Sequence, residues 1–122
     1  MDMDTLFFFN GMPRELSLYE GLLEKLRELG PWTAVVHKTQ ISLNCRRMFA
    51  AVSMTRVRRK ALLPEHFIVV TLGLPHNLES SRPVQVSVRP NRWTHHVVIG
   101  RLEDLDEELM AWLREAYAFA DR

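Results

Sequence analysis

The stretch FIVVTLGL, residues 67–74, is apolar at both odd and even positions. Neighbouring side chains of a β-strand point to opposite faces of the sheet, so a run that is apolar on both faces is typical of a central strand. Pro75 follows the run, and proline cannot donate a hydrogen bond to a neighbouring strand. The stretch therefore predicts a buried central strand, and the rest of the chain has to supply its neighbours.

The segments on either side alternate apolar and polar residues, which is typical of strands with one wet face. Residues 39–46 form one such segment, whose apolar face carries Ile41, Leu43 and Cys45. Arg46 and Arg47 predict the tip of a hairpin that leads into a strand over 48–54. After the central strand, 84–89 predicts another half-wet strand, and a turn at Pro90 and Asn91 leads into a strand over 93–99.

Helical spacing appears near both ends of the chain. From Pro13 onward, leucine and tyrosine recur every three or four positions until Gly30, which predicts an amphipathic helix of about 16 residues. The second helical segment covers 102–120, and its acidic first turn suits the positive end of the helix dipole. Asp104 and Glu107 resemble a capping box at its start.

These elements predict a single α+β domain over residues 1–122. We expect a two-layer sandwich, in which a mostly antiparallel sheet of about five or six strands carries both amphipathic helices on its apolar face. A chain of 122 residues, 47% of them hydrophobic, can bury one core without metals or disulfides. We find no internal repeat and no low-complexity linker that would divide it.

Cysteine content and hydropathy narrow the cellular setting. The single cysteine, Cys45, cannot form an internal disulfide, and Asp2 and Asp4 stand where a secretory signal would be basic. The apolar run at 6–9 is far shorter than the roughly 20 residues that cross a bilayer. We therefore expect a cytoplasmic protein with no membrane partner.

Charge is distributed unevenly, although the formal net charge is only +1. Residues 1–31 and 102–122 have net charges of −3 and −5, whereas residues 32–101 carry eleven basic and two acidic side chains, a net charge of +9. Either the acidic ends neutralise the basic middle in the folded chain, or the basic middle binds an anionic partner. The charge counts alone favour neither reading.

Arginines dominate the basic segment, and a guanidinium suits phosphate because its planar fork donates two parallel hydrogen bonds. The candidate anion-binding or nucleic-acid-binding residues are Arg46, Arg47, Arg56, Arg58, Arg59, Arg89 and Arg92. Three of them lie in TRVRRK, residues 55–60, where the sheet gives way to a loop. The alternative is that these arginines pair with the acidic helices.

Two adjacent histidines, His95 and His96, lie in the last predicted strand and point to opposite faces. We expect His95 to lie near the apolar layer with its imidazole hydrogen-bonded, and His96 to be the better functional candidate. Histidines that point apart cannot chelate one metal ion, and the sequence has no zinc or phosphate-binding motif. We predict no catalytic residue, no metal and no cofactor, and we expect Cys45 to be a buried, inert thiol.

The wet sheet face would form a polar platform. Its predicted members are Lys38, Gln40, Ser42, Asn44 and His96, with Arg46, Gln85 and Arg89 on the same face. Such a face lacks the exposed aromatic pair on which RNA bases stack, so it favours salt-sensitive binding of the nucleic-acid backbone over sequence readout.

Four segments occur in an order that resembles a known family: HKTQISL at 37–43, LGLPHNLES at 72–80, RWTHHVVI at 92–99 and LEDLDEELMAWLREAYAFA at 102–120. Together they resemble the bacterial domains grouped as domain of unknown function 5655, over nearly the whole chain. The resemblance implies a small α+β domain that occurs alone or attached to other modules and has no established activity.

Three functional hypotheses remain open. The first is a non-enzymatic binding module whose basic sheet and loop face takes a polyanion, with nucleic acid as the first choice. The second is protein docking, or formation of a homo-oligomer, through the open sheet face. The third is a small-molecule enzyme that uses His96 with Lys38 or Thr39 as acid, base or binding groups.

Overall fold

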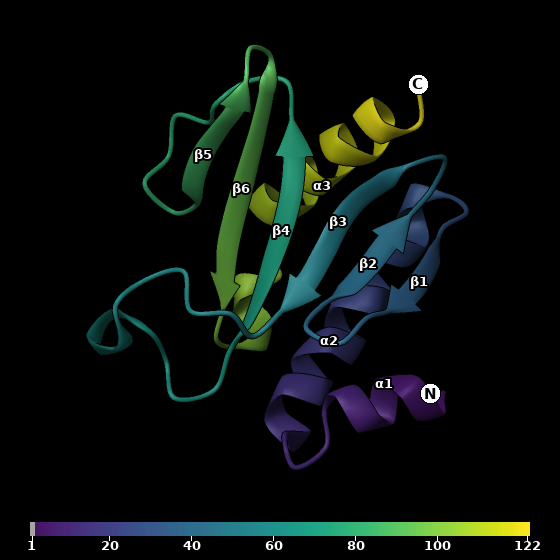
Figure 1. Cartoon of the computed structure of the whole chain (residues 1–122), viewed down its shortest axis with the longest axis vertical. Helices are drawn as coiled ribbons and strands as arrows, with labels where there is room; N and C mark the ends of the chain where they lie inside the picture. Colours follow the sequence, from purple (N-terminus) through teal and green to yellow (C-terminus); the bar gives the residue numbers. More distant parts are fainter. Residues whose placement is uncertain (1) are drawn as a thin grey trace.

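The computed structural model describes residues 2–122 and has two layers, a sheet and a layer of helices (Figure 1). The sheet is antiparallel and six-stranded, with the order β1-β2-β3-β4-β6-β5. Its strands are β1 (Thr33–Val36), β2 (Ile41–Asn44), β3 (Met48–Ser53), β4 (Ile68–Leu74), β5 (Val84–Arg89) and β6 (Arg92–Ile99). The predicted α+β fold with a mostly antiparallel sheet is confirmed.

β4 is the predicted central strand, and it pairs with β3 on one side and β6 on the other. Its side chains on one face are fully buried in the core: Ile68, Val70, Leu72 and Leu74. On the other face, Val69 is buried, but burial decreases along the strand until Gly73 is exposed. The run is therefore covered on both faces at its start and on one face at its end.

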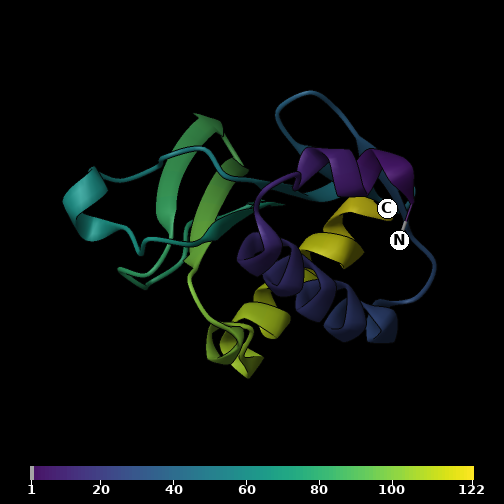
Figure 2. The same cartoon turned by 90° about the horizontal axis from the view of Figure 1, so that it is seen from below.

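Three α-helices accompany the sheet: α1 (Met3–Phe8), α2 (Pro13–Leu26) and α3 (Glu107–Ala120). Figure 2 shows α2 and α3 on the same side of the sheet, as predicted. A 3₁₀ turn extends α2 to Leu29, and another precedes α3. We call the sheet face that points away from these helices the open face. None of the helices in residues 2–122 combines the length and the hydropathy that a membrane span requires.

Two helix details differ from the sequence predictions. The N-cap of α3 is Asp106, whose side chain accepts a hydrogen bond from the backbone N–H of Leu109, so the predicted capping box at Asp104 and Glu107 is wrong. Asp104 instead accepts a hydrogen bond from the backbone N–H of Gly100, just after β6 ends. The short helix α1 was not predicted, because six residues are too few to show a helical period.

Two hairpins turn at the same end of the sheet, the upper end in Figure 1, which we call the hairpin end. One is the predicted turn at Arg46 and Arg47 between β2 and β3. The other joins β5 to β6 through Asn91, whose φ of 61° lies in the left-handed region that asparagine adopts more readily than most residues. The β5–β6 pairing continues to Arg89 and Arg92, beyond the last residue of β4, so this hairpin projects past the central strand.

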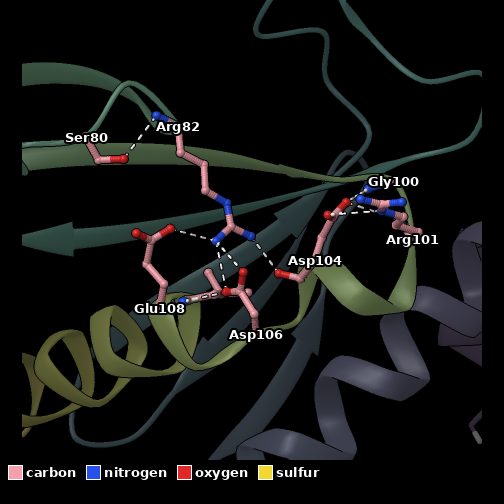
Figure 3. Close-up of polar contacts among 8 residues, drawn as sticks. Ser80, Arg82, Gly100, Arg101, Asp104, Asp106 and Glu108 are labelled. Carbon is pink, nitrogen blue, oxygen red and sulfur yellow. Dashed lines mark hydrogen bonds and ion pairs between the residues drawn. The ribbon is translucent and has the colours of Figure 1, made fainter.

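Arg82 joins the loop before β5 to the start of α3 (Figure 3). Its Nη1 donates hydrogen bonds to carboxylate oxygens of Asp106 and Glu108 at 2.9 Å each, and its Nη2 donates to the backbone oxygen of Asp104 at 2.6 Å. Partial burial raises the pKa of Asp106, but hydrogen bonds from Leu109 and Arg82 outweigh it and hold that pKa below its ordinary value. A side chain from the sheet layer thus fixes the first turn of the C-terminal helix.

His95 lies on the core face of the sheet opposite Leu72, near the apolar layer as predicted, and it is completely buried. Its Nε2 lies 3.1 Å from the backbone oxygen of His76, while its Nδ1 has no hydrogen-bond partner among the described residues. Burial lowers the pKa of His95 below its ordinary value of 6.5. His76 itself is exposed, and hydrogen bonds to Asn77 and Glu115 raise its pKa. Acid therefore changes the contributions of the two histidines to the stability of the fold in opposite directions.

Replacing Arg82 with alanine should lower the free energy of unfolding by about 1–3 kcal/mol, because three acceptors lose a partly buried charged donor. Arg114 is the control, since it also pairs with two carboxylates, from Glu28 and Glu107, but at a more exposed position. Solvent screening should make the loss in Arg114→Ala smaller. Urea unfolding followed by circular dichroism measures the free energy of unfolding of both variants. Equal losses would contradict the conclusion that Arg82 fixes the first turn of α3.

Acid should destabilise the fold through His95. The unfolded chain takes up a proton near pH 6.5, whereas folded His95 stays neutral, so its contribution to stability is present above about pH 6.5 and is lost as the pH falls. The raised pKa of His76 acts oppositely, because its stabilisation is present below about pH 6.5 and is lost as the pH rises. Between about pH 7.5 and 5.5, the urea midpoint should fall less in His95→Met and more in His76→Ala than in wild type. Parallel pH profiles for all three proteins would contradict these assignments.

Candidate functional site

The structure divides the seven predicted arginines between the two ends of the sheet. Four lie at the hairpin end: Arg46, Arg47, Arg89 and Arg92. The other three lie in the loop over 54–67, which begins at the opposite end of β3. The eight residues of β6 alone span roughly 26 Å at about 3.3 Å per residue. The two groups therefore do not form one compact site.

Other arginines neutralise the acidic helices. In residues 2–122, the ion pairs between an arginine and Asp or Glu are Arg27–Glu24, Arg82–Asp106, Arg82–Glu108, Arg101–Asp104, Arg114–Glu28 and Arg114–Glu107. Within residues 2–122, none of the seven predicted arginines takes part in such a pair. The alternative in which these arginines pair with the acidic helices is therefore wrong for these side chains.

The loop over 54–67 uses one of its arginines for its own structure. Arg58 donates hydrogen bonds through Nη2 to the backbone oxygens of Ser81 and Arg82, at 3.2 and 3.0 Å. These bonds fasten the loop to the segment before β5. Arg56 and Arg59 are exposed. The loop thus leaves two arginines for a ligand.

At the hairpin end, arginines stack on the last turn of α3. The guanidinium carbon of Arg92 lies 4.7 Å from the ring centre of Phe119, and that of Arg122 lies 5.5 Å from it. A guanidinium stacked on a ring keeps its N–H edge free for an anion. Sequence reasoning missed Phe119, although an aromatic residue outside the apolar stripe of the last helix was an available signal.

A hollow with a volume of about 260 Å³ opens beside this stack. Its lining residues are Gly73, Leu74, Val88, Arg89, Arg92, Trp93, Thr94 and Phe119, and we call it the Gly73 hollow. Of these, only Arg89 and Arg92 were predicted as site residues. The others come from β4, β5, β6 and α3, which meet only in the folded chain, so sequence spacing does not reveal them.

The predicted polar platform is not continuous. Lys38 and Gln40 lie in the turn between β1 and β2 and not in a strand. Ser42 and Asn44 lie on the open face of β2 and bind each other, since Asn44 Nδ2 donates to Ser42 Oγ at 3.2 Å. Ser42 Oγ also lies 3.1 Å from His37 Nε2. Ser42 Oγ and Asn44 Nδ2 are therefore already engaged with neighbouring side chains.

Gln85 does not lie on the open face, so its predicted place beside His96 is wrong. It pairs with His95 across the β5–β6 ladder, and its side chain accepts from the N–H of Leu78 at 2.6 Å and donates to the oxygen of Leu78 at 2.8 Å. The valines of β5 therefore share the open face with His96, because Val84 is the residue that pairs with it.

The groups of the enzyme hypothesis are held apart. His96 lies on β6 with its Nδ1 2.8 Å from Thr71 Oγ1, and burial lowers the pKa of His96. Lys38 and Thr39 lie in the turn before β2, which is three strand spacings from β6, or roughly 14 Å. They do not form one site with His96.

The remaining candidates are the single cysteine, Cys45, and clusters of side chains that could hold a metal ion. Cys45 was predicted to be buried, but it is only half-buried. Its Sγ lies 3.6 Å from the backbone oxygen of Arg47. In the part of the chain that the structure describes, no group of three or more His, Cys, Asp or Glu side chains is placed to hold a metal ion. The hairpin end, by contrast, brings four exposed arginines and the Gly73 hollow together.

Comparison with known proteins gives a family but no activity. No curated protein and no solved structure matched the chain. A family model described as domain of unknown function (DUF5655) matched residues 8–120, a range that includes α2, all six strands and α3. The chain therefore belongs to the DUF5655 family.

Proposed function

We propose that this domain is a non-enzymatic module that binds nucleic acid through the arginines of the hairpin end. One observation carries the proposal: Arg46, Arg47, Arg89 and Arg92 are exposed at one end of the sheet, and none forms an ion pair within residues 2–122. Unpaired arginines keep their full hydrogen-bonding capacity for phosphate.

The spacing of the two hairpins suits a chain of phosphates. In the strand order, the β2–β3 hairpin and the β5–β6 hairpin are three strand spacings apart, or roughly 14 Å. Phosphates of one strand of duplex DNA advance by about 3.4 Å each along the helix axis. The hairpins would thus contact separate phosphates of one polymer and not the same small anion.

Contacts of this kind position a nucleic acid without reading its sequence. Arginine–phosphate contacts release condensed counterions, so affinity falls steeply with salt. The open face adds little base readout, because Ser42 and Asn44 bind each other. We therefore propose salt-sensitive binding that is tolerant of sequence, with Arg56 and Arg59 as a weaker second contact.

Self-association is the second candidate function. β5 is an edge strand, and Val86 and Val88 on it are 50% and 65% exposed. An edge strand has unpaired backbone groups that can pair with a strand of another molecule. Light scattering across a wide concentration range tests this, since a strict monomer at high concentration would contradict a homo-oligomer.

Alanine at Arg89 and Arg92, or at Arg46 and Arg47, should weaken binding of nucleic acid roughly tenfold or more at about 100 mM salt. Each double variant removes two phosphate contacts, so the slope of log K against log salt should fall by about two. Fluorescence anisotropy with labelled single-stranded DNA, duplex DNA and RNA, at about 50 and 200 mM salt, measures both quantities.

The matched control removes the same charge elsewhere. Arg27 and Arg101 are 74% and 75% exposed and already pair with carboxylates, so their double alanine variant should bind like wild type. A separate Arg56→Ala, Arg59→Ala variant measures the loop. The proposed function is wrong if wild type binds none of the probes at low salt, or if the control loses as much affinity as the hairpin variants.

A further inference from the structure

We infer that the Gly73 hollow binds one unpaired nucleotide, with its phosphate on Arg89 and Arg92 and its base against the apolar wall. This inference rests on the proposed function and narrows its ligand to nucleic acid with unpaired bases. Four features of the hollow support it: the floor, the wall, the cations and the size.

The floor is open because of Gly73. Gly73 pairs with Thr94 across β4 and β6, and both lie on the open face. The pairing of β3 with β4 ends at Leu72, so within residues 2–122 no strand pairs with β4 at Gly73 on that side. Figure 1 shows β3 diverging from the upper end of β4. A Cβ built on Gly73 would have the backbone oxygen of Trp93 as its nearest neighbour, at 3.9 Å. A side chain would fit there, but it would fill the hollow.

Neither backbone nor packing requires glycine at this position. Gly11 and Gly30 have φ values of +74° and +111°, which favour glycine. At Gly21 and Gly100, an added Cβ would lie 2.7 and 2.6 Å from a neighbouring side chain. Gly73 has neither constraint, and glycine weakens a strand. What glycine provides at position 73 is therefore the empty space above the strand, which a bound ligand would fill.

The wall contains a displaced valine. The β5–β6 register shifts between Ser87 and Arg89, so Val88 has no partner across the ladder. Such bulges redirect side chains and occur often beside binding sites. Val88 is 65% exposed at the rim of the hollow, and the half-buried Trp93 is a second apolar lining residue. A nucleobase would cover the exposed surface of Val88.

The two arginines of the hollow occupy paired positions of the sheet. Arg89 is directly opposite Arg92 in the β5–β6 ladder, an arrangement of like charges that destabilises a sheet. Neither has a carboxylate partner within residues 2–122. Phe119 holds the Arg92 guanidinium, which lowers the entropy lost when it binds. A phosphate group between the two arginines would replace repulsion with two charge-assisted hydrogen-bonding partners.

The size limits the ligand. A volume of about 260 Å³ lies just below the roughly 300–1,000 Å³ of pockets for drug-sized ligands, so it suits one nucleotide and not a dinucleotide cofactor. The same chemistry could come from a free nucleotide or from a nucleotide within a strand. A base inside a duplex is stacked and paired, so it cannot enter without being flipped out.

Gly73→Val tests the hollow without removing a charge. Valine favours strands, and the 3.9 Å clearance leaves room for its Cβ, so the variant should fold. Val86→Ile is the matched control, because it adds a methyl group on the open face outside the hollow. Thermal unfolding checks the stability of both variants before binding is measured.

The binding probes are thymidine 5′-monophosphate, oligothymidylate and duplex DNA. With wild type and Val86→Ile, the monophosphate should shift the indole N–H resonance of Trp93, assigned with Trp93→Phe, and oligothymidylate should bind more tightly than the monophosphate. Gly73→Val should weaken monophosphate binding at least tenfold and oligothymidylate binding severalfold, and it should leave weaker duplex binding unchanged.

The outcomes separate this inference from the proposed function. If both DNA forms bind wild type and Gly73→Val equally and the monophosphate binds neither protein, the inference is wrong and the proposed function stands. If no nucleic acid binds wild type, both are wrong. Inorganic phosphate that competes as well as the monophosphate would reduce the hollow to a phosphate site. Phosphotyrosine that binds more tightly than the monophosphate would replace the nucleotide with a phosphorylated peptide.

Discussion

The burial of β4 against the helical layer is the constraint on which the rest of the structure depends. The four side chains of β4 that face α2 and α3 have at most 1% of their surface exposed. Because the helices cover that face, the strands beside β4 turn apolar side chains toward the helices, whereas the open face carries both polar residues and the valines of β5. The arginines at the hairpin end are exposed, so their charges do not need the buried partner that an interior charge requires.

The acidic helices stabilise the fold without cancelling the charge of the hairpins. The acidic first turn of α3 lies at the positive end of its dipole, and Arg82 and Arg114 pair with the carboxylates there. The opposite end of α3 lies near the hairpin end, where Arg92 and Arg122 stack on Phe119. A helix C-terminus favours cations, so the dipole helps to hold these arginines in place without neutralising them as a carboxylate would.

Period-two patterns predicted the sheet well, because burial on one face imposes alternation on each strand. They failed at β5, where we assumed that the valines face the core. β5 is an edge strand, and Gln85 turns toward the helix side because its amide satisfies the backbone of Leu78. The cap of α3 was misplaced by two residues because several acidic residues crowd that turn, and only tertiary contacts decide between Asp104 and Asp106. The arginines of the hairpin end were visible in the sequence, whereas the Gly73 hollow depends on where β3 leaves β4.

Three local costs meet in one place at the hairpin end. Glycine weakens the last part of β4, Val88 exposes apolar surface, and Arg89 lies opposite Arg92. An ordinary strand residue in place of Gly73 would strengthen β4, and a polar residue in place of Val88 would remove the exposed apolar surface. A carboxylate in place of Arg89 or Arg92 would turn the repulsion into attraction. Sequences that fold well are locally consistent, and the places where they break several local rules together are typically functional. A ligand that fills the space over Gly73, covers Val88 and bridges the two arginines would offset all three costs at once.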